Sequence, residues 1–412
     1  MSIEIKMAWR NIWRNSRRSI LTILAIVFAT LLLVFMLSFQ FGSYDAMINT
    51  AVKIHTGHVQ VQAEGYRDKM DVRLVVPDPG AVDDLIRDIP EIDAYTFRAN
   101  AFSLVSSSER TYGVLLTGID PDREARVSTL KRLIRGGEYL TQEDADRALV
   151  GKLLARNLKV DIGDELVILG QGRDGSVAAS VLKVKGIFSS GEDAFDRNSI
   201  QMPLGYFQDL FSMRGAVHEV VVLGRSLEDV EKIKTELVAG VGGMDNDGDL
   251  AVLDWMELMP GIVQSIKLDL VSGLIMYVIL IVVVAFSILN TFLMAIFERT
   301  REFGVLMAIG MAPGRLMRSL FLESTMITLI GIILGIISGG MVTWYYQVHG
   351  ILISGASELL SQYGLPERMY PQLSALSVSI GAGIVLIITI LTAIYPVLKV
   401  RRLRPVEAMT AV

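Results

Sequence analysis

Four long stretches of the chain carry no Asp, Glu, Lys or Arg and are almost wholly apolar: residues 19–44, 270–297, 324–357 and 369–398. A helix rises about 1.5 Å per residue, so about 20 residues cross a hydrocarbon layer of about 30 Å. Within that layer each backbone N–H must be satisfied locally, which favours helices. The pattern predicts four transmembrane helices, at residues 20–44, 270–297, 320–348 and 370–398. A buried helix of a water-soluble protein could explain one such stretch, but not four.

The first stretch has one alternative explanation, a cleaved signal peptide, because basic residues precede it. The apolar part of a signal peptide is only about 7–15 residues long and ends in small residues. Here the apolar run is much longer and ends in Phe39-Gln40-Phe41-Gly42. We therefore predict an uncleaved membrane helix.

Residues 45–269, between the first two spans, have the mixed pattern of a folded domain. Residues 58–62 alternate polar and apolar side chains, as a half-buried strand does. A helix followed by strand sequence is expected twice, at 81–117 and at 227–254, which suggests one subdomain built from two halves. Between them, at about 120–205, we expect an inserted subdomain with helices at 124–134 and 143–158 and strands at 165–169 and 176–188. The predicted fold class is a membrane protein of four transmembrane α-helices with a large α/β extracytoplasmic domain.

The residues before the first span have an amphipathic pattern. At 100° per residue, residues 3–18 place Trp9, Ile12 and Trp13 on one arc and the arginines on the opposite arc. Tryptophan opposite arginine suits a helix that lies in the plane of the lipid headgroups. We predict a cytoplasmic amphipathic helix over residues 1–19, and a plain basic targeting tail is the alternative.

Basic residues identify the cytoplasmic side. Lys and Arg near span ends are retained in the cytoplasm, and they gather before the first span, between the second and third, and after the fourth. Both termini are therefore expected in the cytoplasm, with a tail at 399–412, whereas residues 349–369 form an extracytoplasmic turn. The segment 45–269 then lies outside, with 25 Lys and Arg against 37 Asp and Glu. We interpret this acidic excess as an aid to solubility.

Two further patterns concern helix contacts. The cytoplasmic segment 298–319 continues the second span without a helix breaker until Pro313-Gly314. A short helix that is charged at one end and apolar at the other is suited to dock in a groove of a partner, although a solvated loop also fits the spacing. In the third span glycine recurs at Gly331, Gly335 and Gly339. This spacing lets another helix approach closely, either within the chain or in a homodimer.

No constellation of catalytic residues or metal ligands is recognisable in the sequence. It lacks the Gly-x-x-x-x-Gly-Lys-[Ser/Thr] phosphate-binding loop, and it contains no cysteine. His55 and His58 are interpreted as polar strand residues, not as metal ligands. No ionisable residue lies in the middle of a predicted span, which argues against a proton- or ion-coupled carrier. We therefore predict no catalytic residue, metal or cofactor in this chain, no nucleic-acid partner, and an energy source in another chain.

Several motifs follow one another in a characteristic order. The motif near the N-terminus is Ala8-Trp9-Arg10-Asn11. After the first span comes Gly57-His58-Val59-Gln60-Val61, and before the second span comes Trp255-Met256-Glu257-Leu258-Met259-Pro260. Glu298-Arg299-Thr300-Arg301-Glu302-Phe303-Gly304 runs on to Ala308-Ile309-Gly310, and Arg404-Pro405-Val406-Glu407-Ala408 lies near the C-terminus. In this order, and over nearly the whole chain, they resemble the permease subunits of MacB/FtsX-like ABC exporters, and among them the lipoprotein-releasing LolC/LolE type.

The resemblance implies an outer domain with a two-part porter and an inserted sabre subdomain. It also implies a cytoplasmic coupling helix that seats in a separate ABC ATPase dimer, which would hold ATP and Mg²⁺. No ATPase is expected in front of the permease, since only about 19 residues precede the first span. A second permease subunit, identical or paralogous, is expected beside it. The coupling residues implied are Glu298, Arg299, Arg301, Glu302, Phe303, Gly304, Met307, Ala308 and Gly310.

Such a permease works by mechanotransmission, in which ATP-driven closure of the ATPase moves the coupling segment and the second helix. The expected function is extraction of lipoproteins from the outer leaflet of the bacterial inner membrane for a periplasmic carrier. Acyl chains would contact Phe39, Phe41, Leu268, Ile275 and Ile279. Two alternatives remain: MacB-like efflux of peptides, toxins or drugs, and FtsX-like signalling to a cell-wall hydrolase. The large outer domain favours transport.

Overall fold

The computed structural model describes residues 3–14, 16–244, 249–352 and 368–400. They divide into two compact units. The membrane unit contains the described residues of 1–45, 265–353 and 368–412, and the α/β unit contains those of 46–264. Most of the predicted turn at 349–369 and of the predicted tail at 399–412 lies outside the described residues.

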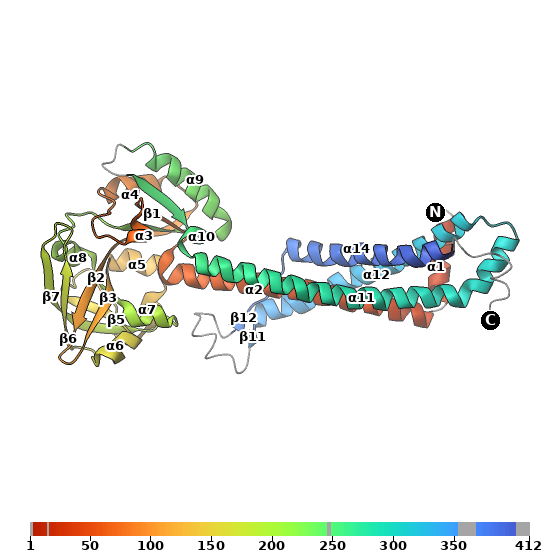
Figure 1. Cartoon of the computed structure of the whole chain (residues 1–412), viewed down its shortest axis with the longest axis horizontal. Helices are drawn as coiled ribbons and strands as arrows, with labels where there is room; N and C mark the ends of the chain where they lie inside the picture. Colours follow the sequence, from red (N-terminus) through yellow and green to blue (C-terminus); the bar gives the residue numbers. More distant parts are fainter. Residues whose placement is uncertain (1–2, 15, 245–248, 353–367, 401–412) are drawn as a thin grey trace. The chain divides into compact units, whose positions relative to one another are not determined.

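Among the described residues, four helices are long and apolar enough to cross a membrane: α2 (Ser16–Ala51), α11 (Pro260–Ala308), α12 (Pro313–His349) and α14 (Ala375–Val400). They lie side by side in Figure 1. The predicted fold class, four apolar helices with a large α/β domain, is confirmed. The helix ends differ from the sequence-based placement, because α2 and α11 extend well beyond an apolar span and α14 begins at Ala375, not at residue 370.

The amphipathic helix is shorter than predicted: α1 (Ile3–Arg14) ends before residue 15, and residues 16–18 already belong to α2. Ala8 and Ile12 are fully buried, and α1 contacts α12. Trp9 and Trp13 stay exposed and meet edge to face, with ring centroids 5.9 Å apart. The apolar arc therefore divides into a small side packed on the bundle and an aromatic side left uncovered.

One apolar cluster joins the helices of the membrane unit. Its fully or almost fully buried members come from α1, α2, α11, α12 and α14: Ile12, Ile26, Ala29, Leu33, Ile288, Ile327, Ile332 and Val385. Two short antiparallel strands, β11 (Ile351–Leu352) and β12 (Arg368–Met369), pair between α12 and α14.

The α/β unit is built on a ten-stranded mixed sheet. Its path runs β10-β1-β9-β2-β3-β8-β5-β7-β4, and β6 pairs with β2 and β7. The strands are β1 (Val59–Ala63), β2 (Ile92–Ser106), β3 (Thr111–Ile119), β4 (Ile134–Gly137), β5 (Arg147–Gly151), β6 (Glu165–Gln171), β7 (Val177–Phe188), β8 (Ser199–Pro203), β9 (Glu219–Gly224) and β10 (Leu250–Asp254). All pairs are antiparallel except β3 with β8 and β5 with β7.

Short helices connect the strands. They are the π-helical turn η1 (Val52–Thr56), α3 (Tyr66–Lys69), α4 (Pro79–Arg87), α5 (Pro121–Val127), the 3₁₀ turn η2 (Leu130–Leu133), α6 (Lys152–Leu158), α7 (Asp193–Asn198), α8 (Leu204–Leu210), the 3₁₀ turn η3 (Leu227–Asp229), α9 (Val230–Val241) and α10 (Trp255–Leu258). The two expected helix–strand successions are α4–β2 and α9–β10.

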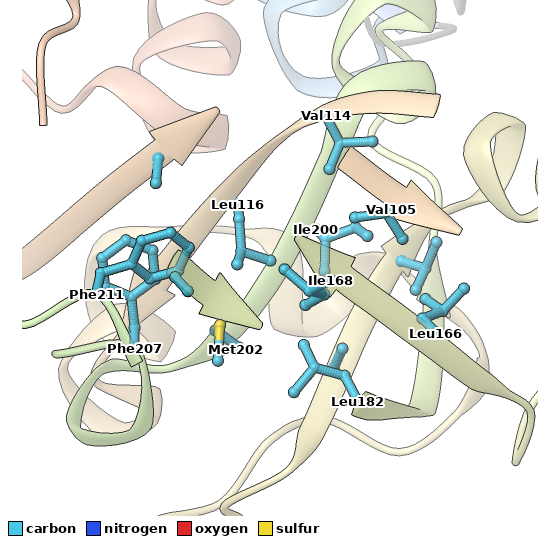
Figure 2. Packing of buried hydrophobic residues seen from close by; sticks show 14 of the residues in the cluster. Val105, Val114, Leu116, Leu166, Ile168, Leu182, Ile200, Met202, Phe207 and Phe211 are labelled. Atoms are coloured by element: carbon cyan, nitrogen blue, oxygen red, sulfur yellow. The ribbon is translucent and has the colours of Figure 1, made fainter. Parts of the chain in front are cut away.

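The described residues of this unit form two large apolar cores and a smaller cluster around Ile119, Leu130 and Phe188. In one, α4 and α9 pack on β1, β2, β9 and β10 through alternating valines such as Val59, Val61 and Val220. In the other, shown in Figure 2, Phe207 and Phe211 stack with ring centroids 4.4 Å apart beside Leu116 and Met202, while side chains of β6, β7 and β8 complete the cluster. The long strand β2 contributes to both cores, so one sheet runs through both parts of the unit.

Two helices expected in the middle of the unit were wrong in extent. Residues 143–158 contain the strand β5 before the short helix α6, because Ala148 and Val150 are buried between neighbouring strands. Residues 124–134 are interrupted at Ser128, whose backbone is extended and whose hydroxyl donates to the carbonyl of Ile54. His55 lies in η1 and not in a strand.

A buried arginine fixes η1 to the sheet. The Arg98 guanidinium on β2 donates to both carboxylate oxygens of Glu124 on α5, at 3.0 and 2.6 Å, and to the carbonyl of His55. The side chains of Arg98 and Glu124 are 1% and 0% exposed. Burial, together with the charge of Arg98, lowers the pKa of His55 to about 3, so this imidazole is neutral. The preceding carbonyls of η1 are also occupied, by Ser128 at Ile54 and by the Thr129 N–H at Lys53.

Removing Arg98 should destabilise the α/β unit strongly. Arg98→Met leaves the Glu124 carboxylate buried without its partner, which costs about 3–5 kcal/mol in the free energy of unfolding. Denaturant unfolding of the purified full-length protein measures this loss. Lys232→Met, which breaks the exposed pair with Glu91, is the matched control and should cost about 1 kcal/mol or less. Equal losses in the two variants would contradict the assignment.

Candidate functional site

The segment predicted to couple to an ATPase is the end of α11. We call residues 298–308 the α11 extension. The helix runs through them without interruption and ends at Ala308, two residues before Gly310, whose φ of +100° is a left-handed conformation that favours glycine. The Met311 N–H donates to the carbonyl of Leu306, and the Gly310 N–H to that of Met307, as in a Schellman motif. Pro313 then occupies the first turn of α12.

A buried ion pair joins the α11 extension to α12. Arg299 Nη1 lies 3.0 Å from the Glu323 carboxylate, and each side chain is about one-tenth exposed. The guanidinium also lies over the ring of Phe303, 5.3 Å from its centroid. Phe303 packs in a small apolar cluster with Ile296 and Leu316. Arg299 and Phe303 therefore hold two helices of the same chain together and are not available to a partner.

Two further ion pairs, less buried than the first, join the α11 extension to the start of the chain. Glu302 accepts from Arg14 on α1 at 2.5 Å, and Glu298 accepts from Arg18 on α2 at 2.8 Å. Such exposed pairs contribute about 0.2–1 kcal/mol each. They affect the position of the extension more than the stability of the fold.

Beside these contacts, the α11 extension and the residue that follows it carry a stripe of exposed side chains. Arg301, Val305, Ala308 and Ile309 are all exposed and follow the spacing i, i+4, i+7, i+8 of one helix face. Ile309 is 79% exposed, the largest value among the exposed large apolar side chains. We call these four residues the exposed stripe. An uncovered apolar surface at the end of a rigid helix is suited to a partner.

The predicted coupling residues therefore lie in different environments. Arg301 and Ala308 are on the exposed stripe, Gly310 caps the helix, and Met307 is partly buried. Glu298 and Glu302 are exposed but ion-paired within the chain. Arg299, Phe303 and Gly304 are buried. The sequence analysis did not assign Val305 or Ile309; their apolar side chains at helical spacing beside Arg301 were the signal available for them.

The predicted substrate-facing residues do not form one cluster. Leu268, Ile275 and Ile279 share an exposed face of α11. Phe39 and Phe41 on α2 are half-buried, and Phe39 packs on Phe35 with ring centroids 6.4 Å apart.

At that level of the membrane unit α2 and α11 meet through polar side chains. Asp269 accepts from Tyr44 at 2.6 Å and from Gln40 at 3.0 Å, and the Gln40 side-chain carbonyl accepts from Tyr277 at 2.8 Å. The sequence analysis did not find this polar contact.

The three spaced glycines of α12 lie against α2 of the same chain. A Cβ added at Gly331 would lie 2.7 Å from Ile26, one at Gly335 2.5 Å from Thr30, and one at Gly339 3.1 Å from Leu31. Of the two expected roles of the glycine spacing, the structure therefore shows the close helix contact within the chain.

A large side chain at Gly335 should disrupt this contact. Gly335→Leu forces α2 and α12 apart, and overpacking of this kind costs about 1–3 kcal/mol. We expect a lower thermal unfolding temperature of the detergent-purified protein. Gly340→Leu is the matched control in the same helix, because nothing lies within 4 Å of an added Cβ there. If both variants unfold at the temperature of the unmodified protein, the close contact is not present.

Comparisons with known proteins identify the two parts of the chain. Residues 19–239, more than half of the chain, match the family described as MacB-like periplasmic core domain. Residues 274–405 match the family described as FtsX-like permease C-terminal.

Individual relatives agree with these matches. The chain is 23% identical to the lipoprotein-releasing system transmembrane protein LolC of Xylella fastidiosa, over 73% of this chain and 74% of that protein. It is 22% identical to the pyoverdine export ATP-binding/permease protein PvdT of Pseudomonas aeruginosa, over 99% of this chain and 58% of that protein. The crystal structure of the periplasmic region of MacB from Actinobacillus actinomycetemcomitans aligns with a TM-score of 0.37 and 15% identity, over 52% of this chain and 94% of that one. The chain belongs to the family of ABC transporter permeases of the LolC/MacB/FtsX type.

Proposed function

We propose that this permease extracts lipoproteins from the outer leaflet of a bacterial inner membrane and delivers them to a periplasmic carrier. The observation that carries the proposal is the similarity to LolC, which extends over similar shares of both chains. In this proposal ATP is hydrolysed by a separate ABC ATPase dimer, which would hold ATP and Mg²⁺; the match to 74% of the LolC transmembrane protein supports that arrangement. A second permease, identical or paralogous, completes the transporter, and both ends of this chain face the cytoplasm.

The proposed mechanism is mechanotransmission along α11. This helix is continuous over 49 residues, from Pro260 to Ala308, a length of about 73 Å at about 1.5 Å per residue. A push at the α11 extension therefore acts on one hydrogen-bonded rod. The apolar windows of the four spans contain no ionisable residue near their middle, which fits a substrate that is lifted from one leaflet and does not cross the membrane.

Acyl chains of the substrate rest, in this proposal, on the exposed face of α11 that carries Leu268, Ile275 and Ile279. At membrane depth such a face already contacts lipid tails, so acyl chains would be held there by van der Waals packing and not by exclusion of water. Phe39 and Phe41 are half-buried in α2 and serve as a secondary contact.

The ATPase binds the exposed stripe. Ile309→Asp places a charge where an apolar side chain enters the ATPase, and we expect affinity between permease and ATPase to fall by about tenfold or more. A pull-down titration of the ATPase on the permease in nanodiscs measures the change. Ile162→Asp, the same substitution at an exposed isoleucine of the α/β unit, should leave that affinity unchanged. Unaltered binding by Ile309→Asp would exclude the stripe as the docking surface.

Co-purification tests the substrate. We expect the permease, isolated with its ATPase in the absence of ATP, to retain triacylated lipoprotein that mass spectrometry identifies and that ATP releases. The similarity to PvdT over 99% of this chain favours a second candidate, export of a small molecule or peptide. Association with a periplasmic adaptor and an outer-membrane channel, with no bound lipoprotein, would replace the first proposal by the second. Activation of a cell-wall hydrolase without any transported substrate would replace both by signalling.

A further inference from the structure

The two glutamates of the α11 extension form ion pairs with arginines of the same chain in a regular order. Glu298 and Glu302 are one helical turn apart on α11, and Arg14 and Arg18 are four positions apart in the sequence, on α1 and α2. The contacts are Arg14 with Glu302 and Arg18 with Glu298, so the arginines and glutamates pair in opposite sequence order. We call these two ion pairs the ion-pair ladder. The α11 extension and α1 lie at the same end of the membrane unit in Figure 1.

The ladder spans the junction between two helices. Arg14 is the last residue of α1, whereas Arg18 lies in the first turn of α2. The extension is therefore bound on both sides of residue 15. On its other side it is bound to α12 by the buried pair of Arg299 and Glu323. Glu302 also lies 3.4 Å from Arg299, so the ladder is continuous with the buried pair.

The helices around the ladder are held together by apolar packing and do not depend on the ladder. Ala8 and Ile12 are fully buried, and α1 contacts α12, while Phe303 and Leu316 are buried between α11 and α12. Arg14 and Glu302 are about half exposed, so their attraction is screened by water and contributes little to stability. What the ladder does provide is a fixed position of the α11 extension relative to α1, through Arg14, and relative to the start of α2, through Arg18.

We infer that the ion-pair ladder makes α1 a moving part of the ATPase-coupling block, with Arg14 and Glu302 as positioning residues. When the extension is pushed, α1 travels with it and keeps the exposed stripe at a constant angle to the bundle. The headgroup-facing Trp9 and Trp13 then guide the block along the membrane surface. This inference rests on the proposed function for the source of the push, but the ladder itself is testable without it.

Charge exchange tests the ladder. The chain contains no cysteine, so spin labels at Arg10→Cys and Val305→Cys report the distance between α1 and the extension in full-length protein in nanodiscs. We expect a narrow distance distribution in the parent, a broad one in Arg14→Glu and in Glu302→Arg, and a narrow one again in the double exchange. Arg17→Glu changes the same charge at an exposed neighbouring position and should leave the distribution narrow. A broad distribution in the parent, or no recovery in the double exchange, would overturn the ladder.

A second readout tests the coupling role, in chains without the labels. For the permease–ATPase complex we expect each single exchange to lower the amount of a fluorescent triacylated lipoprotein released per ATP hydrolysed by about three- to tenfold, and the double exchange to restore it. Recovery of the distance without any effect of the single exchanges on this ratio would overturn the coupling role.

The failure of the proposed function has a different signature. If the parent complex releases no lipoprotein, the proposed function fails, and the coupling role is then judged from the ATP hydrolysis rate of the same variants. An unchanged rate in the single exchanges would overturn it, whereas a changed rate that the double exchange restores would support it.

Discussion

The structure of the membrane unit depends on one constraint: a backbone amide within hydrocarbon must be hydrogen-bonded inside its own helix. A helix that crosses the hydrocarbon must therefore stay helical over the whole layer. The helix α11 continues beyond its apolar span, as far as Ala308. The left-handed Gly310, the pair of Arg299 with Glu323 and the ion-pair ladder all lie where this helix meets water and other helices. The candidate site is thus the end of α11 where the helix leaves the membrane, and it acts through ion pairs and apolar contacts.

The sequence predicted the spans well because apolar length is a local property, whereas the partners of charged residues are not. Glu302 and Arg299 look alike in a sequence, as charges beside an apolar run. The structure separates them, because Glu302 meets a residue 288 positions away and Arg299 meets one 24 positions away. The same reason explains the error at residues 143–158, where Ala148 and Val150 have acceptable helix propensity but are buried as a strand between two others.

Two buried arginine–glutamate pairs serve related purposes in the two units. Arg98 with Glu124 fixes η1, the turn that directly follows α2, to the sheet. Arg299 with Glu323 fixes the α11 extension to α12. Buried pairs of this kind add little net stability compared with apolar residues, but they permit only one geometry. Each lies at the end of one of the long helices, which is where a defined geometry is needed if movement is to be passed on.

The four long helices differ in how firmly they are held. In α2 and α12, 39% of the most apolar window is buried within the chain, and the glycine contacts interlock them. In α11 only 6% of that window is buried. Within that window α11 makes few close-packed contacts, whereas α2 and α12 make many, and the firm attachment of α11 is the buried pair of Arg299 with Glu323 in the α11 extension. The helix proposed to carry the movement is thus held at its extension and little enclosed along its most apolar window, so the mechanical compliance of the bundle is concentrated in that window.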